Sequence, residues 1–146
     1  MAFTDAAALK ASSAIGRPNV STASGDTDGD GDFNRSDDKG IEPESVVVGE
    51  VAGRLYAFVG LERDSGIVVL DVSDPSAPRF VTYATNRKFP RNPSTNALLA
   101  CNDVNDCGDL GPGGLTFVPT VQSPTGNALL IVSNEVSSTT TIWEIR

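Results

Sequence analysis

Two seven-residue stretches decide the fold: YAFVGLE at residues 56–62 and LLIVSNE at residues 129–135. They align with each other at an offset of about 73 residues. Both are rich in apolar side chains and end on a polar turn, which is typical of a buried strand followed by a reversal of the chain. The sequence therefore predicts a repeated strand unit.

The repeat extends to both sides of these stretches. PESV at residues 43–46 aligns with PGGL at 112–115 at an offset of about 69, and VVLDV at 68–72 aligns with TIWEI at 141–145 at the later offset of about 73. Each unit then contains three or four short strands joined by turns. Its period is longer than that of a solenoid coil and comparable with that of a propeller blade carrying loop insertions.

Short apolar runs bounded by Gly, Pro and Asp locate the individual strands. We expect strands near residues 45–50, 54–62, 66–73 and 79–85 in the first unit, and near 114–119, 127–135 and 139–146 in the second. The chain divides into a partly irregular N-terminal segment (1–25), an acidic loop (26–44), a first blade (45–85), a loop with a cysteine pair (86–112) and a second blade (113–146).

Two of the strands are apolar on both faces, which distinguishes between β architectures. IVVL at residues 67–70 and LLIV at 129–132 do not alternate with polar residues. Stacked blades cover both faces of a sheet, whereas the alternative, a β-sandwich, leaves one face of each sheet in water. We therefore expect an all-β fold of two antiparallel propeller-type blades. Because a ring needs about four to eight blades, this ring is incomplete. Three alternatives follow: the chain is a fragment of a larger propeller, several copies self-associate through their exposed blade faces, or those faces are tolerated at a cost in solubility.

Composition excludes several classes of function. The net charge of -8 repels phosphate backbones and anionic lipid surfaces, so nucleic acid is not an expected partner. The chain has no histidine, which removes Ser/His/Asp triads and nearly all zinc sites. No apolar run is long enough for a membrane helix. Residues 1–17 lack the pattern of a secretion signal, so we expect that any such signal was removed or lies upstream of them.

An acidic stretch, DTDGDGDFNRSD at residues 26–37, has the spacing of a twelve-residue calcium loop. Gly31 supplies the turn at its sixth position. The predicted Ca²⁺ ligands are Asp26, Asp28, Asp30, Asp32 and Asp37. Aspartate at the last position is a poorer bidentate ligand than glutamate, so we expect weak binding, suited to extracellular calcium. The alternative is a solvated acidic linker.

The two cysteines, Cys101 and Cys107, lie in the polar segment CNDVNDC. A short loop there can close on itself, so we predict a local disulfide; the alternative is a pair of reduced thiols. Zinc binding is disfavoured because two further soft ligands are missing.

Several separated motifs resemble one family, in the same order along the chain. They are RSDDKGIEPE (35–44), YAFVGLER (56–63), DLGP (109–112) and SNEVSSTTT (133–141), preceded by LKAS (9–12), IGR (15–17) and GDTDGDGD (25–32). They are similar to the C-terminal part of choice-of-anchor I domain proteins. These are large bacterial surface or secreted propeller proteins, sometimes labelled alkaline phosphatase-like. The resemblance implies an extracellular, cell-surface or periplasmic location.

The chain departs from the family pattern at two places. The family has a strand-rich segment between the aspartate loop and the RSDDKG motif, whereas here Asp32 is followed almost directly by Arg35, as if a blade were deleted. Asp37 would then complete the calcium loop only by accident. The usual GPEG turn is GPGG at residues 111–114, so a glutamate is replaced by Gly113.

Three glutamates occupy repeated positions: Glu44, Glu62 and Glu135. They either point into a central channel and share a metal ion, or bond backbone N–H groups at the blade turns, and we favour the second role. The sequence as a whole favours a non-catalytic surface module that binds calcium and contacts an extracellular protein or glycan. The alternative is the remnant of a metal-dependent phosphoesterase, although we identify no catalytic residue.

Overall fold

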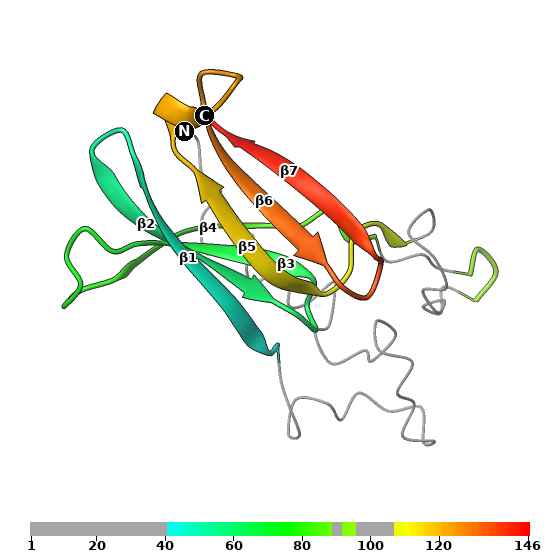
Figure 1. Cartoon of the computed structure of the whole chain (residues 1–146). Coiled ribbons are helices and arrows are strands. Elements are labelled where there is room, and N and C mark those ends of the chain that lie inside the picture. The colour runs from blue at the N-terminus through cyan, green and yellow to red at the C-terminus, as the bar shows by residue number, and fades with distance from the viewer. Residues whose placement is uncertain (1–40, 89–91, 96–106) are drawn as a thin grey trace.

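Seven strands form two antiparallel sheets in the computed structural model, which describes residues 41–88, 92–95 and 107–146 (Figure 1). The first sheet contains β1 (Pro43–Val51), β2 (Arg54–Leu61), β3 (Gly66–Asp71) and β4 (Arg79–Ala84). The second contains β5 (Pro112–Val118), β6 (Ala128–Asn134) and β7 (Thr139–Ile145). The predicted all-β class is confirmed for this part of the chain. A short 3-10 helix, η2 (Thr120–Gln122), was not predicted.

In both sheets the strands follow each other in chain order. The orders are β1-β2-β3-β4 and β5-β6-β7, and every neighbouring pair is antiparallel. This simple meander is the order of strands within a blade, and the described strands contain no crossover of the Greek-key type. β5 lies next to β1 and β2 and runs in the same direction as β1 (Figure 1).

The pairing registers reproduce the repeat predicted from the sequence. In the first sheet Pro43 lies opposite Leu61 and Ser45 opposite Gly60, and the register shifts between these pairs. In the second sheet Pro112 lies opposite Asn134 and Gly114 opposite Ser133, again with a shift between the pairs. The offset then rises from about 69 to about 73 residues because the connection from β5 to β6 is longer than the tight turn between β1 and β2.

The core forms where two different faces of the sheets meet. We call the face of the first sheet with Phe58, Ile67 and Val69 face A, and the opposite face, with Ala57, Val59 and Leu70, face B. We name the faces of the second sheet by their equivalence in the repeat, so that face B of the second sheet carries Leu130, Val132 and Trp143. Buried residues of face A in the first sheet pack against buried residues of face B in the second.

One aromatic pair marks the centre of this contact. The rings of Phe58 on β2 and Phe117 on β5 stack with centroids 5.7 Å apart. Gly49 on β1 makes room for Phe117, because a Cβ at this glycine would lie 2.4 Å from the ring. The sheets diverge away from this contact, and the resulting groove of about 470 Å³ is lined mainly by apolar side chains, including Ile67 and Trp143.

The connection that follows β4 is attached to both sheets. Arg87 is buried and donates from Nη1 to the carbonyl oxygen of Arg63, 2.7 Å away, at the turn after β2. Asp109 accepts a hydrogen bond from Thr139 Oγ1 at 2.6 Å, and others from Thr141 and Asn86. These bonds fix the end of the connection against β7.

Candidate functional site

A β-bulge opens each repeat unit and displaces one residue from the strand pairing. Glu44 is that residue in β1, between Pro43 and Ser45. Gly113 is its equivalent in β5, between Pro112 and Gly114. A bulge redirects the side chain at this point, which is why bulges often occur next to functional sites. The first unit thus presents a carboxylate where the second presents none.

The turns after the second strand of each unit supply two more carboxylates. Glu62 follows β2 and Glu135 follows β6, and each backbone N–H donates to an equivalent carbonyl: Glu62 to Glu42 at 2.9 Å, and Glu135 to Gly111 at 2.8 Å. Both turns end on a serine in the left-handed region, with φ of 61° and 55°. The two glutamates are therefore held by the same backbone geometry.

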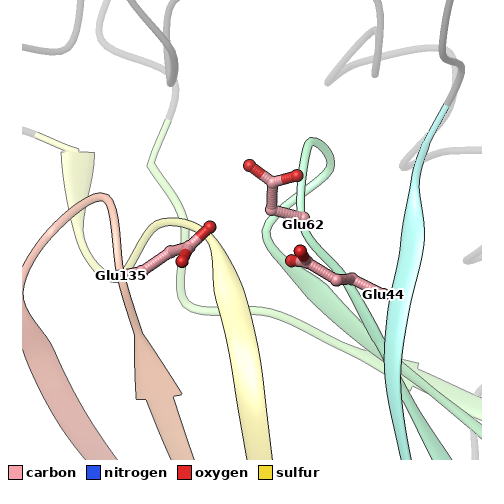
Figure 2. Close-up of side chains that lie close together, drawn as sticks. All are labelled: Glu44, Glu62 and Glu135. Carbon is pink, nitrogen blue, oxygen red and sulfur yellow. The ribbon is translucent and has the colours of Figure 1, made fainter.

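The three glutamates converge at one end of the two sheets. Carboxylate oxygens of Glu44, Glu62 and Glu135 all lie within 4.8 Å of one another. Figure 2 shows the three side chains directed into the same space from β1 and from the turns after β2 and β6. Both sheets contribute, so the site exists only when the sheets are packed together. We call these three residues the glutamate cluster.

The charges around this cluster are unbalanced. Arg63 Nε lies 2.5 Å from Glu42 Oε2 and 3.6 Å from Glu62 Oε2. Burial raises the pKa of Glu62, and a hydrogen bond with Glu42 and the charges of Glu42 and Glu44 raise it further, whereas Arg63 lowers it. A cation among the carboxylates would relieve this repulsion.

The cluster offers carboxylate oxygens, which are the kind of ligand that a hard cation such as calcium takes. Ca²⁺ takes carboxylate oxygens at about 2.3–2.6 Å, so two ligands on opposite sides of the ion lie about 4.6–5.2 Å apart. One carboxylate oxygen from each glutamate lies within 4.8 Å of the other two, so the three are close enough together to share one ion. In the described part of the chain no backbone N–H donates to these three carboxylates, so the turn-capping role favoured from the sequence is not observed there.

Gly113 lies beside the cluster. A Cβ at Gly113 would lie 3.3 Å from Cδ of Glu135 and 3.5 Å from Oε2 of Glu44. The glutamate of the GPEG pattern would therefore extend into the same space. Two bulge positions and two turn positions surround this space. Because glycine stands at position 113, only three of these four positions carry a carboxylate.

In the part of the chain that the structure describes, none of the other predicted site residues lies at the glutamate cluster. The predicted calcium ligands Asp26, Asp28, Asp30, Asp32 and Asp37 lie outside the described residues, as does Cys101. Cys107 is completely buried. The calcium loop and the disulfide therefore stay predictions.

Sequence reasoning missed two charged partners near the cluster, Glu42 and Arg63. Glu42 has a backbone φ of 52° and is equivalent to Gly111, whose φ is 74°. Both residues precede a bulge and accept the turn N–H. The alignment of Glu42 with Gly111 in the repeat is the sequence feature that indicates a positive φ at this position.

Comparison with known protein families gives a match over the segment that contains β1, β2 and β3. Residues 32–75 match the choice-of-anchor I domain. The resemblance drawn from the sequence motifs is confirmed over this segment, which contains Glu44 and Glu62 of the cluster. Choice-of-anchor domains are surface-associated, so the match indicates a cell-surface or extracellular domain.

A second comparison gives a more distant relative. The chain is similar to Gigasin-3a of Magallana gigas, with 29% identity over 116 residues. The matched region covers 77% of this chain but only 39% of the relative. No solved structure matches the chain. Within the described residues, none of the helices has the length and apolar character required to cross a membrane.

Proposed function

We propose that this chain is a non-catalytic, extracellular or cell-surface module of the β-propeller type, which binds calcium and serves in binding or adhesion. The observation that carries the proposal is the convergence of Glu44, Glu62 and Glu135 from two sheets. A cation held there would link the sheets through their repeated turns. Calcium is the proposed ion because the ligands are all carboxylates and because extracellular calcium is abundant enough for weak sites.

The proposed partner is an extracellular protein or a glycan, contacted by the loops of the module. The family match supports a surface location, and the net charge of -8 argues against nucleic acid. The aspartate loop at residues 26–37 is a second proposed calcium site, on grounds of sequence spacing. The two sites are separable by mutation because they share no residue.

The decisive experiment measures calcium binding by calorimetry and thermal unfolding in EDTA and in Ca²⁺. Binding to extracellular-type sites should raise the free energy of unfolding by about 1–3 kcal/mol at millimolar Ca²⁺. The double variant Glu62→Gln with Glu135→Gln should lose the share of this calcium-dependent stabilisation that the glutamate cluster provides. Glu50→Gln, which removes one exposed charge elsewhere on β1, is the matched control.

A further variant set separates the two sites and tests the non-catalytic assignment. Asp28→Asn with Asp30→Asn should remove only the calcium bound by the aspartate loop. If neither pair of substitutions alters calcium binding, the proposal fails. Turnover of an aryl phosphate with added Ca²⁺, Mg²⁺ or Zn²⁺ that disappears in the Glu62→Gln variant would instead establish a phosphoesterase.

A further inference from the structure

The contact between the two sheets joins non-equivalent faces, and among the described residues no sheet packs on the two complementary faces. Face A of the first sheet packs on face B of the second. Face B of the first sheet and face A of the second are therefore on the outside of the pair. A contact between unlike faces is heterologous, and the same contact can be repeated with further sheets.

The outer face B of the first sheet is apolar across its full width. One register row crosses all four strands as Val48, Ala57, Leu70 and Phe80. The neighbouring row is Val46, Val59, Val68 and Tyr83. Val46 and Val48 are 65% and 53% exposed. A sheet face of this kind is unusual in water unless another surface covers it.

The repeat shows what kind of surface fits this face. The equivalents of Val48, Ala57 and Leu70 in the second sheet are Phe117, Leu130 and Trp143, which form one register row there. That row lies in the core, packed against face A of the first sheet. The outer row, in which Val48 is exposed, Leu70 half-buried and Ala57 buried, is thus the counterpart of a row that packs against a face A.

Face A of the second sheet mixes apolar and polar residues: Leu129 on it is buried, Ile131 is half-buried, and Ser133 and Thr140 are exposed. Its central row is Thr116, Ile131 and Ile142, and Ile142 is 63% exposed. The side-chain volumes of the two outer faces also complement each other. The inner contact sets Gly49 against Phe117, and the equivalent outer residues are Val118 and Val48, so volume lost on one side is gained on the other.

We propose that a second copy of this chain docks head to tail, with face A of its second sheet on face B of the first sheet. The proposal goes beyond the calcium site and does not depend on it. Because each copy supplies two blade-like sheets and a ring needs about four to eight, closure requires about two to four copies. In a closed ring both faces of every copy are covered and no terminal copy remains.

The test is the oligomeric state of the full chain by sedimentation velocity over a range of concentrations. The ionic strength should be at least about 0.15 M, because the net charge of -8 opposes association at low salt. We expect assemblies of about two to four copies. Val48→Asp and Ile142→Asp should each raise the dissociation constant by at least about tenfold, while circular dichroism and the unfolding temperature stay those of a folded chain. Val121→Asp is the control, because Val121 is 92% exposed on η2, which belongs to neither face.

Mixing the two variants distinguishes this arrangement from a symmetric one. A Val48→Asp chain retains its face A, and an Ile142→Asp chain retains its face B, so an equimolar mixture should form a one-to-one pair that neither forms alone. A chain that is monomeric at all concentrations overturns the proposal. So does an assembly unaffected by Ile142→Asp, because the interface would then be symmetric or elsewhere.

Discussion

Glu62 lies where its surroundings disfavour a negative charge on its side chain. Its side chain is 12% exposed, and burial together with Glu42 and Glu44 raises its pKa above the usual 4.5. Between the pKa of the unfolded chain and the raised pKa of the folded chain, the native state binds more protons. The free energy of unfolding must therefore fall as the pH rises through that interval.

Replacing Glu62 by Gln should remove this part of the pH dependence. In EDTA, urea unfolding between about pH 4 and about pH 8 should show a smaller loss of stability with rising pH for Glu62→Gln than for the natural chain. Glu50→Gln serves as control, since Glu50 lies outside the glutamate cluster. Equal slopes for all three proteins would show that Glu62 titrates normally.

Substitution of Gly113 by glutamate should add one metal ligand to the glutamate cluster. Gly113→Glu restores the carboxylate of the GPEG pattern within reach of Glu135 and Glu44. We expect calcium affinity to rise by about tenfold, because each added carboxylate strengthens binding of a hard cation. Calorimetry measures the change.

Gly113→Gln is the matched control for this gain, since it adds the same length of side chain without the charge. In EDTA, Gly113→Glu should also be less stable than Gly113→Gln, because four carboxylates then repel one another. A glutamate variant with the affinity of the glutamine variant would mean that position 113 does not reach the ion.

At the level of the elements, packing of β1 against β5 depends on the absence of a side chain at Gly49. A Cβ at this position would lie 2.4 Å from the ring of Phe117, which also stacks on Phe58. Gly49→Ala should lower the free energy of unfolding by about 1–3 kcal/mol through overpacking. Chemical denaturation gives the value.

A compensating variant tests the reason for that loss. Phe117→Leu in the Gly49→Ala background should recover part of the stability, so the two changes should couple by at least about 0.5 kcal/mol in a double-mutant cycle. If the two effects are purely additive, the loss of stability in Gly49→Ala comes from the β1 backbone and not from the contact between the sheets.

The connection after β4 should depend on Asp109 for its attachment to β7. Burial alone would raise the pKa of Asp109, but hydrogen bonds from Asn86, Thr139 and Thr141 outweigh it and hold the pKa below 3.8. Asp109→Ala should cost about 1–3 kcal/mol at neutral pH. The difference from the natural chain should shrink as the pH falls through the folded-state pKa, where the carboxylate is protonated.

Asp74→Ala is a suitable comparison for Asp109→Ala. Asp74 also has a lowered pKa, through bonds to Ser76, but it lies in an exposed turn. Its removal should cost less stability than the removal of Asp109, because solvent screens an exposed carboxylate. If both variants lose the same stability, the Asp109 bonds to β7 contribute no more than an ordinary surface turn.

On the scale of the whole molecule, the two sheets share one core and should unfold together. Trp143, the single tryptophan, reports on the second sheet, and far-ultraviolet circular dichroism reports on both. We expect the two signals to give one transition. Phe58→Ala, in the first sheet, should lower the midpoint of the Trp143 signal by an amount equivalent to about 3–5 kcal/mol. A Trp143 transition unaffected by Phe58→Ala would make the sheets independent.

Much of the local structure follows from sequence alone. All seven strands were predicted, because runs such as IVVL at residues 67–70 are β-branched and bounded by turn residues. The repeat was predicted with its change of offset, which the pairing registers reproduce. The short helix η2 escaped prediction because three residues carry too little periodicity to reveal it.

The candidate site shows where sequence reasoning stops. Glu44, Glu62 and Glu135 were singled out because they recur at repeated positions, and that signal needs no structure. Their separation of at most 4.8 Å could not be predicted, because it depends on how one sheet packs on the other. Arg63 and Glu42 were missed for the same reason, since their relevance comes only from the carboxylates around them.

The sequence by itself determined the all-β fold class, the strands, the repeat and the resemblance to choice-of-anchor I proteins, which the family match confirms over residues 32–75. These features depend on local patterning, on hydrophobic periodicity and on turn residues, which each segment carries within itself. Only the tertiary structure decided which faces meet, because faces A and B are both apolar and either could be buried. That choice brings the glutamates of YAFVGLE and LLIVSNE, the two stretches that specify the strands, into one cluster.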